Sequence, residues 1–491
     1  MVSAALSGGI GPSILPLRHP LGEGRASADI SPPRAGRFPR LTAGIERSPV
    51  EIPDPAAPLP ARGTAWELPE KPGFWRMAPA LPVMLFAAAA SWSIAAAQTA
   101  VVLLAIVLAA GLAAARGRLP ERTRTLPWTL RLVFVFLAIQ ALSIALGIHP
   151  THSLRCFRGS WVMLFPMLFW VGLSPGALRA RALRLFTASA ALAGLYGAIQ
   201  HFRGVDWLGG RELERIGGGF MAVGTLGHHL SYAGVLLPAF FLALAFSAAS
   251  RPRLIWAAAA VAIGLGLTFS YARTSWVGLA AGLLFLALLR GWRALLLLLG
   301  VLAAAGLAAA WIEPALFGRV TSILREVAAQ GSTNESARAR LWLTSLRMAA
   351  DHPWIGTGLG SFGTLFDQYR VPGDYMSVAH PHSDPLNILV ETGIVGLAAW
   401  AAIWIAFFRE MRPALRRGAG GAQGTPALRR ERLVPAALGA GVIALLVGGL
   451  GQCFSTDEKV AQVWWFLVAA GLHEARGLGK RALERGSEAC G

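Results

Sequence analysis

Apolar runs of about 20 residues recur along this chain from Trp75 onward, and a run of this length crosses the hydrocarbon core of a bilayer as one α-helix. The pattern predicts about twelve spans. They fall near 78–95, 98–115, 128–147, 160–175, 183–202, 228–249, 254–271, 273–290, 294–312, 386–408, 434–452 and 460–475. We therefore expect an all-α polytopic membrane protein with one large polar loop, 313–385.

Arginines gather in every second connection between these runs. The basic connections contain Arg116, Arg118, Arg122 and Arg124; Arg179, Arg181 and Arg184; Arg251 and Arg253; Arg290 and Arg293; and Arg409, Arg412, Arg416, Arg417, Arg429, Arg430 and Arg432. Cytoplasmic connections of membrane proteins carry an excess of Lys and Arg. The alternation predicts that both termini are cytoplasmic and that 313–385 faces outward.

Composition supports a membrane protein and limits the other classes. Only 14% of the residues are charged, against about a quarter in soluble domains, and the net charge is +19. A basic chain can bind nucleic acid, but these arginines follow the membrane pattern, so we expect no nucleic-acid partner. The three cysteines form no CxxC or zinc-type spacing, which argues against a thiolate metal site.

Three regions follow from these patterns. Residues 1–74 are rich in Pro and Arg without sustained periodicity, which predicts a disordered cytoplasmic tail. Residues 75–475 form the multi-span membrane domain, and 476–491 form a second cytoplasmic tail.

The large loop contains its own helical pattern. Ser332 and Glu335 form a capping-box pattern, and a helical run closes at Pro353. The expected apolar face is Ala339, Trp342, Leu343, Leu346, Ala349 and Ala350, and the expected polar face is Arg340, Thr344, Arg347 and Asp351. Such an amphipathic helix lies on the membrane surface or packs on the bundle. The GxGxxG at Gly358, Gly360 and Gly363 follows no strand, so it predicts a turn rather than a dinucleotide site.

The strongest chemical candidates lie where this loop meets the tenth apolar run. His380 and His382 occur in the segment Ala379–Asn387, at the predicted boundary between water and lipid. Titratable groups at this depth usually serve a function, and histidine moves protons near neutral pH. Glu391 lies further inside the run, where it orients a histidine, pairs with an arginine or serves as a structural polar group.

Arginines supply candidate anion sites on the same side. Arg273 interrupts an apolar region at its outward end, and a guanidinium binds phosphate through two parallel hydrogen bonds. Arg211 and Arg215 precede the glycine run 217–219, in a segment that continues to Gly224–His229. Flexible backbone and basic groups suit a phosphate cradle, and a solvated loop is the alternative.

These residues resemble the superfamily of O-antigen ligases and O-antigen polymerases of the bacterial envelope. The ligase signature is His, then Asn, Ser or Gln, nine residues, Gly, two residues, and Gly, Thr or Tyr. His382, Ser383, Gly393 and Gly396 match it. The blocks around Arg338, Trp342, His352–Gly360 and Ala272–Trp276 are also similar. The resemblance covers about 80–475 and is strongest over 270–400.

The resemblance implies a metal-independent glycosyltransferase of the inner membrane that needs no cofactor. Its donor is a glycan on undecaprenyl pyrophosphate, and its acceptor is a hydroxyl on the periplasmic side, first of all lipid A-core. Polymerisation of a polyprenyl-linked glycan and transfer to protein are the alternatives, and a transporter is the alternative of another class.

Roles for individual residues follow from the same resemblance. His382 would handle the acceptor, Arg273 would bind pyrophosphate, and His380, Ser383 and Glu391 would support them. An arginine usually lies close before the Gly-x-x-Gly-His block, but Met221 occupies that place here. The second pyrophosphate ligand is therefore open between two residues, Arg211 and Arg215.

Overall fold

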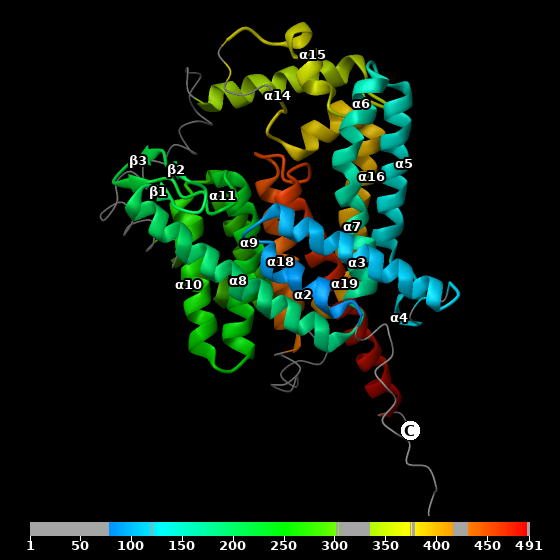
Figure 1. Ribbon diagram of the computed structural model, residues 1–491, viewed down its shortest axis with the longest axis vertical. Helices are drawn as coiled ribbons and strands as arrows, with labels where there is room; N and C mark the ends of the chain where they lie inside the picture. The colour runs from blue at the N-terminus through cyan, green and yellow to red at the C-terminus, as the bar shows by residue number, and fades with distance from the viewer. Residues whose placement is uncertain are drawn as a thin grey trace, which may run out of the picture. The chain divides into compact units, whose positions relative to one another are not determined.

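The computed structural model describes residues 78–300 except 118 and 120, then 303, 334–373, 375, 379–415 and 431–488. Helices dominate this part of the chain, with four very short strands in two hairpins (Figure 1). The elements are α2 (Ala80–Ala89), α3 (Ile94–Ala114), α4 (Glu121–Arg124), α5 (Trp128–Leu146), α6 (Pro150–Cys156), η1 (Phe157–Leu164), α7 (Phe165–Gly172), α8 (Gly176–Arg203), β1 (Val205–Asp206), β2 (Arg211–Glu212), β3 (Arg215–Ile216), β4 (Gly219–Phe220), α9 (His229–Ala249), α10 (Arg253–Phe269), α11 (Arg273–Arg290), α14 (Asn334–Asp351), α15 (Ser361–Tyr369), α16 (Asp384–Leu415), α18 (Leu433–Gly448) and α19 (Glu458–Glu488).

Six described helices are long and apolar enough to cross a membrane: α3, α5, α8, α9, α11 and α16. Three shorter helices, α2, α10 and α18, are also apolar. The predicted class is therefore confirmed: this is an α-helical polytopic membrane protein. The count of about twelve spans stays a prediction, and most of the predicted span 294–312 lies outside the described residues.

Several helix boundaries differ from the sequence prediction. α8 begins at Gly176, directly after Pro175, so Arg179 and Arg181 lie on a helix rather than in a connection. Arg179 is buried and its Nε lies 2.7 Å from Glu474 Oε1. This pair joins α8 to α19, which continues as a helix to Glu488, well into the predicted tail. Arg179, which was predicted from the sequence to lie in a cytoplasmic connection, therefore also forms an ion pair between two helices.

Small residues let neighbouring helices approach closely. A Cβ at Gly194 of α8 would lie 2.4 Å from the carbonyl oxygen of Ala262 in α10. A Cβ at Gly278 of α11 would lie 2.3 Å from the carbonyl oxygen of Ala444 in α18. Close backbone approach of this kind is how membrane helices associate without a hydrophobic driving force.

The two loop helices, α14 and α15, cover one end of the bundle, above α6 and α16 (Figure 1). They form a small core with α16 that includes Leu341, Met348, Phe362, Phe366 and Val390. The predicted helix of the large loop is confirmed, but the side that packs on the bundle is not the predicted apolar face. The buried side is Ala337, Leu341, Thr344, Ser345, Met348 and Ala349, while Trp342, Leu343 and Leu346 are exposed.

Thr344 and Ser345 can be buried because their hydroxyls donate 2.8 Å hydrogen bonds to the carbonyl oxygens of Arg340 and Leu341 in the preceding turn. Helical Ser and Thr commonly satisfy themselves in this way. A prediction from hydrophobicity therefore counts Thr344 and Ser345 as polar positions, although burying their hydroxyl groups costs little free energy.

Candidate functional site

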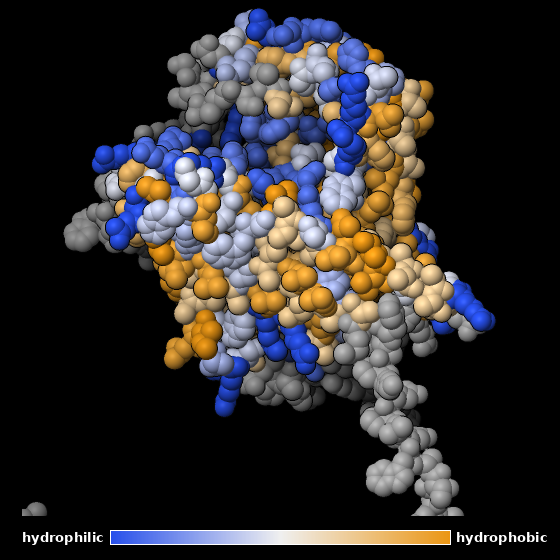
Figure 2. All heavy atoms as spheres, in the orientation of Figure 1, coloured by the Kyte–Doolittle hydropathy of each residue, from blue (hydrophilic) through white to orange (hydrophobic). Residues whose placement is uncertain are grey.

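Hydrophilic residues gather in a hollow below α14, between the hairpins and the column formed by α5 and α16 (Figure 2). The turn that contains His380 and His382 leads directly into α16. His382 has a backbone φ of 52°, which is uncommon for a residue other than glycine. The two imidazole rings lie 4.3 Å apart, and the His382 amide donates to His380 Nδ1 at 3.2 Å. The two predicted histidines therefore form one compact turn.

The His382 ring has a side-chain partner that sequence reasoning missed. Its Nδ1 lies 2.9 Å from Gln452 Oε1, in the connection between α18 and α19. A carboxamide oxygen only accepts hydrogen bonds, so Nδ1 carries the proton in this arrangement. The lone pair of the neutral ring then lies on Nε2.

Burial keeps both histidines neutral near pH 7. It lowers the pKa of His382 below 6.5, and the positive neighbours Arg338 and His228 act in the same direction, while the hydrogen bond to Gln452 opposes them. Burial also lowers the pKa of His380 to about 4, with further contributions from His382 and His228. A neutral imidazole is the form that accepts a proton.

The connection 449–457 is fixed to the start of α16. The Asp384 amide donates to the Gly449 carbonyl oxygen at 2.7 Å. Asp384 Oδ1 accepts hydrogen bonds from the Ser455 amide at 2.9 Å and from the Ser455 hydroxyl. These contacts bracket Gln452 and hold it beside His382.

Arg273, the first residue of α11, lies at the same connection. A Cβ at Gly451 would lie 2.7 Å from Thr274 Cγ2, and a Cβ at Gly448 would lie 3.2 Å from the Thr274 carbonyl oxygen. Glycines at and just after the end of α18 therefore allow the start of α11 to approach closely. One connection thus contacts both the partly buried Arg273 segment and His382.

The arginines of the segment 203–227 have a different environment. Arg211 Nη2 lies 2.9 Å from Oδ2 of the buried Asp206, and its Nη1 donates to the Gly227 carbonyl oxygen at 3.0 Å. Its charge is therefore offset within the segment. Arg215 is exposed on β3.

Glu391 supports the loop rather than a histidine or an arginine. Its Oε1 accepts a 2.9 Å hydrogen bond from the Gly360 amide, and Asn387 is a second partner. Gly360 belongs to the glycine turn between α14 and α15. Ser383, the other predicted support, is buried, and its carbonyl oxygen accepts from the Asn387 amide at 2.9 Å.

The signature glycine Gly393 interrupts α16 with φ 66° and ψ −170°. A Cβ there would lie 2.3 Å from the carbonyl carbon of Trp354. The amides of Ile394 and Val395 donate to the carbonyl oxygens of Pro353 and Trp354 at 2.8 and 3.3 Å. The glycine is needed because the end of α14 inserts its backbone into the interrupted helix.

Other polar groups around the histidines come from distant segments. The Ser231 hydroxyl donates to Asp457, and Lys459 Nζ donates to the Leu226 carbonyl oxygen at 2.7 Å. The pKa of His228 is lowered by burial, although Asp457 opposes the shift. The predicted segment Gly224–His229 therefore meets the start of α19. No group of three His, Cys, Asp or Glu residues in the described ranges is arranged to hold a metal ion.

The fold and this arrangement define a polytopic membrane protein with a partly buried histidine pair and basic groups at one end of its bundle. Residues 258–401 match the family described as O-antigen ligase, which confirms the resemblance over this segment. An O-antigen ligase of Pseudomonas aeruginosa is 35% identical over 136 residues, which are 28% of this chain and 29% of that protein. The chain thus matches less than a third of that relative. Within the family segment lie Arg273, Arg338, His382 and Glu391.

Proposed function

We propose that this protein transfers a glycan from undecaprenyl pyrophosphate to an acceptor hydroxyl at the periplasmic face of the inner membrane, most simply as an O-antigen ligase that uses lipid A-core. The family match supports glycan transfer in lipopolysaccharide assembly. The observation that carries the proposal is the hydrogen bond between His382 and Gln452, which leaves Nε2 as the basic nitrogen of a neutral ring.

In the proposed reaction the acceptor oxygen attacks the anomeric carbon of the donor sugar. The bond between that carbon and the phosphate oxygen breaks, and undecaprenyl pyrophosphate leaves with the electron pair. The acceptor proton moves to His382 Nε2. Burial and its positive neighbours keep the His382 ring neutral, which is the form that can accept this proton.

Basic groups stabilise the leaving pyrophosphate, whose negative charge increases as the bond breaks. Arg273 is the predicted ligand. Arg338 on α14 is a second one, because it lies close enough to His382 to influence its titration. Arg338 is proposed in place of Arg211, which already pairs with Asp206, and Arg215 stays the alternative within the segment 203–227. The donor supplies its own leaving group, so the proposed reaction uses no metal ion and no cofactor.

Transfer from a purified donor tests the function. The detergent-solubilised protein and a polyprenyl-pyrophosphate glycan donor are combined in three parallel reactions. Each reaction contains one acceptor: lipid A-core, a second molecule of unextended donor, or a peptide. Ligation predicts product only with lipid A-core. Product only with a second donor molecule indicates a polymerase, and product only with peptide indicates a protein glycosyltransferase. No release of polyprenyl pyrophosphate with any acceptor would contradict glycan transfer.

The proposed topology comprises about twelve spans, cytoplasmic tails at 1–74 and 476–491, and a periplasmic loop at 313–385. Trp354 is 70% exposed in that loop, and Arg251 is exposed in a basic connection. In a variant without native cysteines, Trp354→Cys is expected to react with a membrane-impermeant thiol reagent in intact cells. Arg251→Cys is expected to react only after lysis. Labelling of both in intact cells contradicts this topology.

A further inference from the structure

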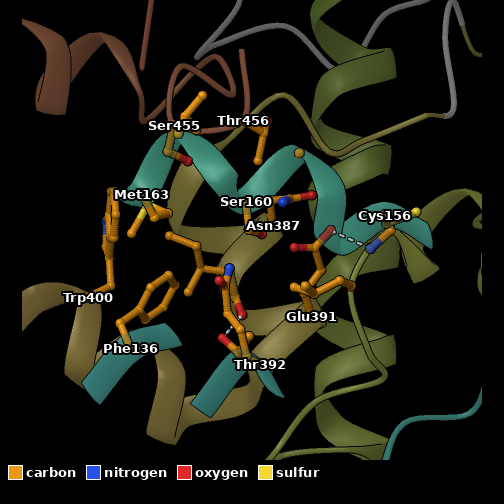
Figure 3. A pocket seen from close by; sticks show the side chains of 16 residues that line it. Phe136, Cys156, Ser160, Met163, Asn387, Glu391, Thr392, Trp400, Ser455 and Thr456 are labelled. Atoms are coloured by element: carbon orange, nitrogen blue, oxygen red, sulfur yellow. Dashed lines mark hydrogen bonds between the residues drawn. The ribbon is translucent and has the colours of Figure 1, made fainter. Parts of the chain in front are cut away.

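A cavity of about 210 Å³ lies between α5, η1, α16 and the connection 449–457. Ser455 and Thr456 line one end of it, and Phe136 and Trp400 line the other (Figure 3). Its volume is about seven times the share of one water molecule in the liquid, which is enough for a single sugar ring. The proposed chemistry at His382 uses none of these lining groups.

Gln140 of α5 lines this cavity and carries an acceptor oxygen, Oε1, that has no hydrogen-bond partner among the described residues. Its side chain is 8% exposed, and no described group hydrogen-bonds to its Oε1. A buried acceptor without a donor costs about 1–3 kcal/mol, and the lipid around a membrane helix provides no donor. An unpartnered acceptor in the cavity wall suits a ligand that donates hydrogen bonds.

The remaining lining fits one chemical class. Asn387 and the Glu391 carboxylate add hydrogen-bonding groups on α16, beside Gln140. Phe136 and Trp400, with ring centroids 5.6 Å apart, add an apolar wall. Acceptors on one side and aromatic rings on the other match a sugar, which has hydroxyl donors at its rim and C–H groups on its faces.

The mouth of the cavity favours an acidic substituent on that sugar. Gly159 of η1 lines the cavity, is exposed, and has open space where a Cβ would lie. Arg155 and Arg158 both precede Gly159 in sequence, and both are exposed. They are the basic groups nearest to this mouth in sequence, and a phosphate or carboxylate on the sugar would be attracted to them.

The cavity shares its walls with the candidate active site. Ser455 lines it and donates to Asp384, two residues after His382, while Gln452 of the same connection contacts His382. The Arg273 end of α11 reaches this connection from the side of α18, whereas α5 packs against α16 (Figure 1). The cavity thus lies on a different flank from Arg273.

We infer that this cavity is the binding subsite for the acceptor, and that it holds one hydroxylated, acid-substituted sugar ring of the acceptor glycan. The inference rests on the proposed function, since an acceptor must approach the donor sugar from the side away from the leaving pyrophosphate. Arg273 lies where it would hold the leaving pyrophosphate, and the cavity lies on the other flank, from which the acceptor would approach.

Kinetics of Gln140→Met test the subsite. The substitution preserves length and removes the acceptor oxygen. Because that oxygen has no hydrogen-bond partner among the described residues, the melting temperature is expected not to fall. The KM for the acceptor is expected to rise about tenfold, the equivalent of one hydrogen bond, with the donor KM unchanged. Gln462→Met is the control, because Gln462 is also buried and its side-chain oxygen is also unpartnered among the described residues, but it does not line the cavity. Equal effects of the two substitutions, or a change in donor KM alone, would overturn the inference.

Direct binding separates this inference from the proposed function. Saturation-transfer NMR on the solubilised protein is run with methyl α-glucopyranoside, its 6-phosphate, and glycerol. The inference predicts signals for the sugars that weaken in Gln140→Met, and Arg158→Ala is expected to remove the advantage of the phosphate. Binding without transfer would leave the subsite standing and contradict the transferase. Transfer without sugar signals, or glycerol signals equal to those of the sugars, would contradict the subsite.

Discussion

Two polar regions at the same end of the molecule show opposite uses of charge. Around His382, polar groups are buried, and their partners come from distant segments, as in the pair with Gln452. In the hairpins Val205–Phe220, the main ion pair joins Arg211 to Asp206, five residues away. The first region depends on the whole fold, whereas the second is satisfied locally.

This difference shows why a basic residue in sequence is a weak sign of an anion site. Arg211 has the residue type and the glycine-rich surroundings of a phosphate ligand, but a buried carboxylate already neutralises it. For His382, in contrast, burial lowers the pKa and so sets the protonation state of the ring. Function depends on which partner the fold supplies.

The largest expected effects fall on His382 and Arg273. Arg273→Ala is expected to reduce transfer about a hundredfold or more, as the loss of one preorganised electrostatic donor does. Arg273→Lys restores only part, because lysine lacks the planar fork. His382→Ala is expected to abolish most transfer but to retain binding of a polyprenyl-pyrophosphate analogue, which Arg273→Ala weakens. Near-normal transfer by folded His382→Ala would show that the histidine assignment is wrong.

A smaller effect is expected at Gln452, which positions the ring. Gln452→Leu is expected to lower kcat about tenfold with little change in either KM, because it frees the ring to rotate and to change tautomer. Gln452→Glu places a carboxylate beside Nδ1, which stabilises the imidazolium and moves the acid limb of the pH profile upward. An unchanged profile in Gln452→Glu would show that the contact does not act through His382.

The pH dependence of the wild type follows from the direction of the shift. Burial lowers the pKa of His382 below 6.5, so the neutral base persists below that pH in the folded protein. Transfer is expected to hold from pH 8 to 6.5 and to fall only below it. The contribution of these two histidines to folding stability is fully present above pH 6.5 and declines toward pH 4, because the unfolded chain binds protons that the folded His380 and His382 exclude. An acid limb centred above pH 6.5 would contradict this.

The smallest effects are expected in the hairpins, and they test the comparison itself. Arg211→Ala and Arg215→Ala are each expected to change donor affinity by less than about threefold, within the range of surface charges. Should this segment hold pyrophosphate after all, Arg215→Ala will weaken donor binding more than Arg211→Ala, because the charge of Arg211 is already offset. Isothermal titration with the donor analogue distinguishes these outcomes.

Periodicity in the sequence predicted the helical membrane class and the loop helix well, because lipid requires long apolar helices. It was wrong about which side of α14 is buried, since Thr344 and Ser345 satisfy their hydroxyls within the helix. Helix ends such as Gly176 were also misplaced. A charged residue on a helix cannot be told from one in a connection by charge alone.

For the site, the short segment around His382 could be found because histidine is rare at a membrane boundary and because its spacing to Gly393 resembles a known signature. Gln452, Asp457 and Lys459 could not be found, because each acquires its partners through tertiary packing. Gly358 and Gly360 lie in the predicted turn, whereas Gly363 lies in α15. The packing role of the segment between α14 and α15 became visible only from the close approach of Gly356 to Glu391.

Because α16 is interrupted at Gly393, the nine residues between Ser383 and that glycine fix the distance and the rotation between His382 and the interruption. One end of this stretch is fixed by the backbone of Pro353 and Trp354, and the other carries His382. Adding one residue would turn the histidine by about 100° around the helix axis and move it by about 1.5 Å. The number of residues in this stretch, more than their identity, therefore sets where His382 points.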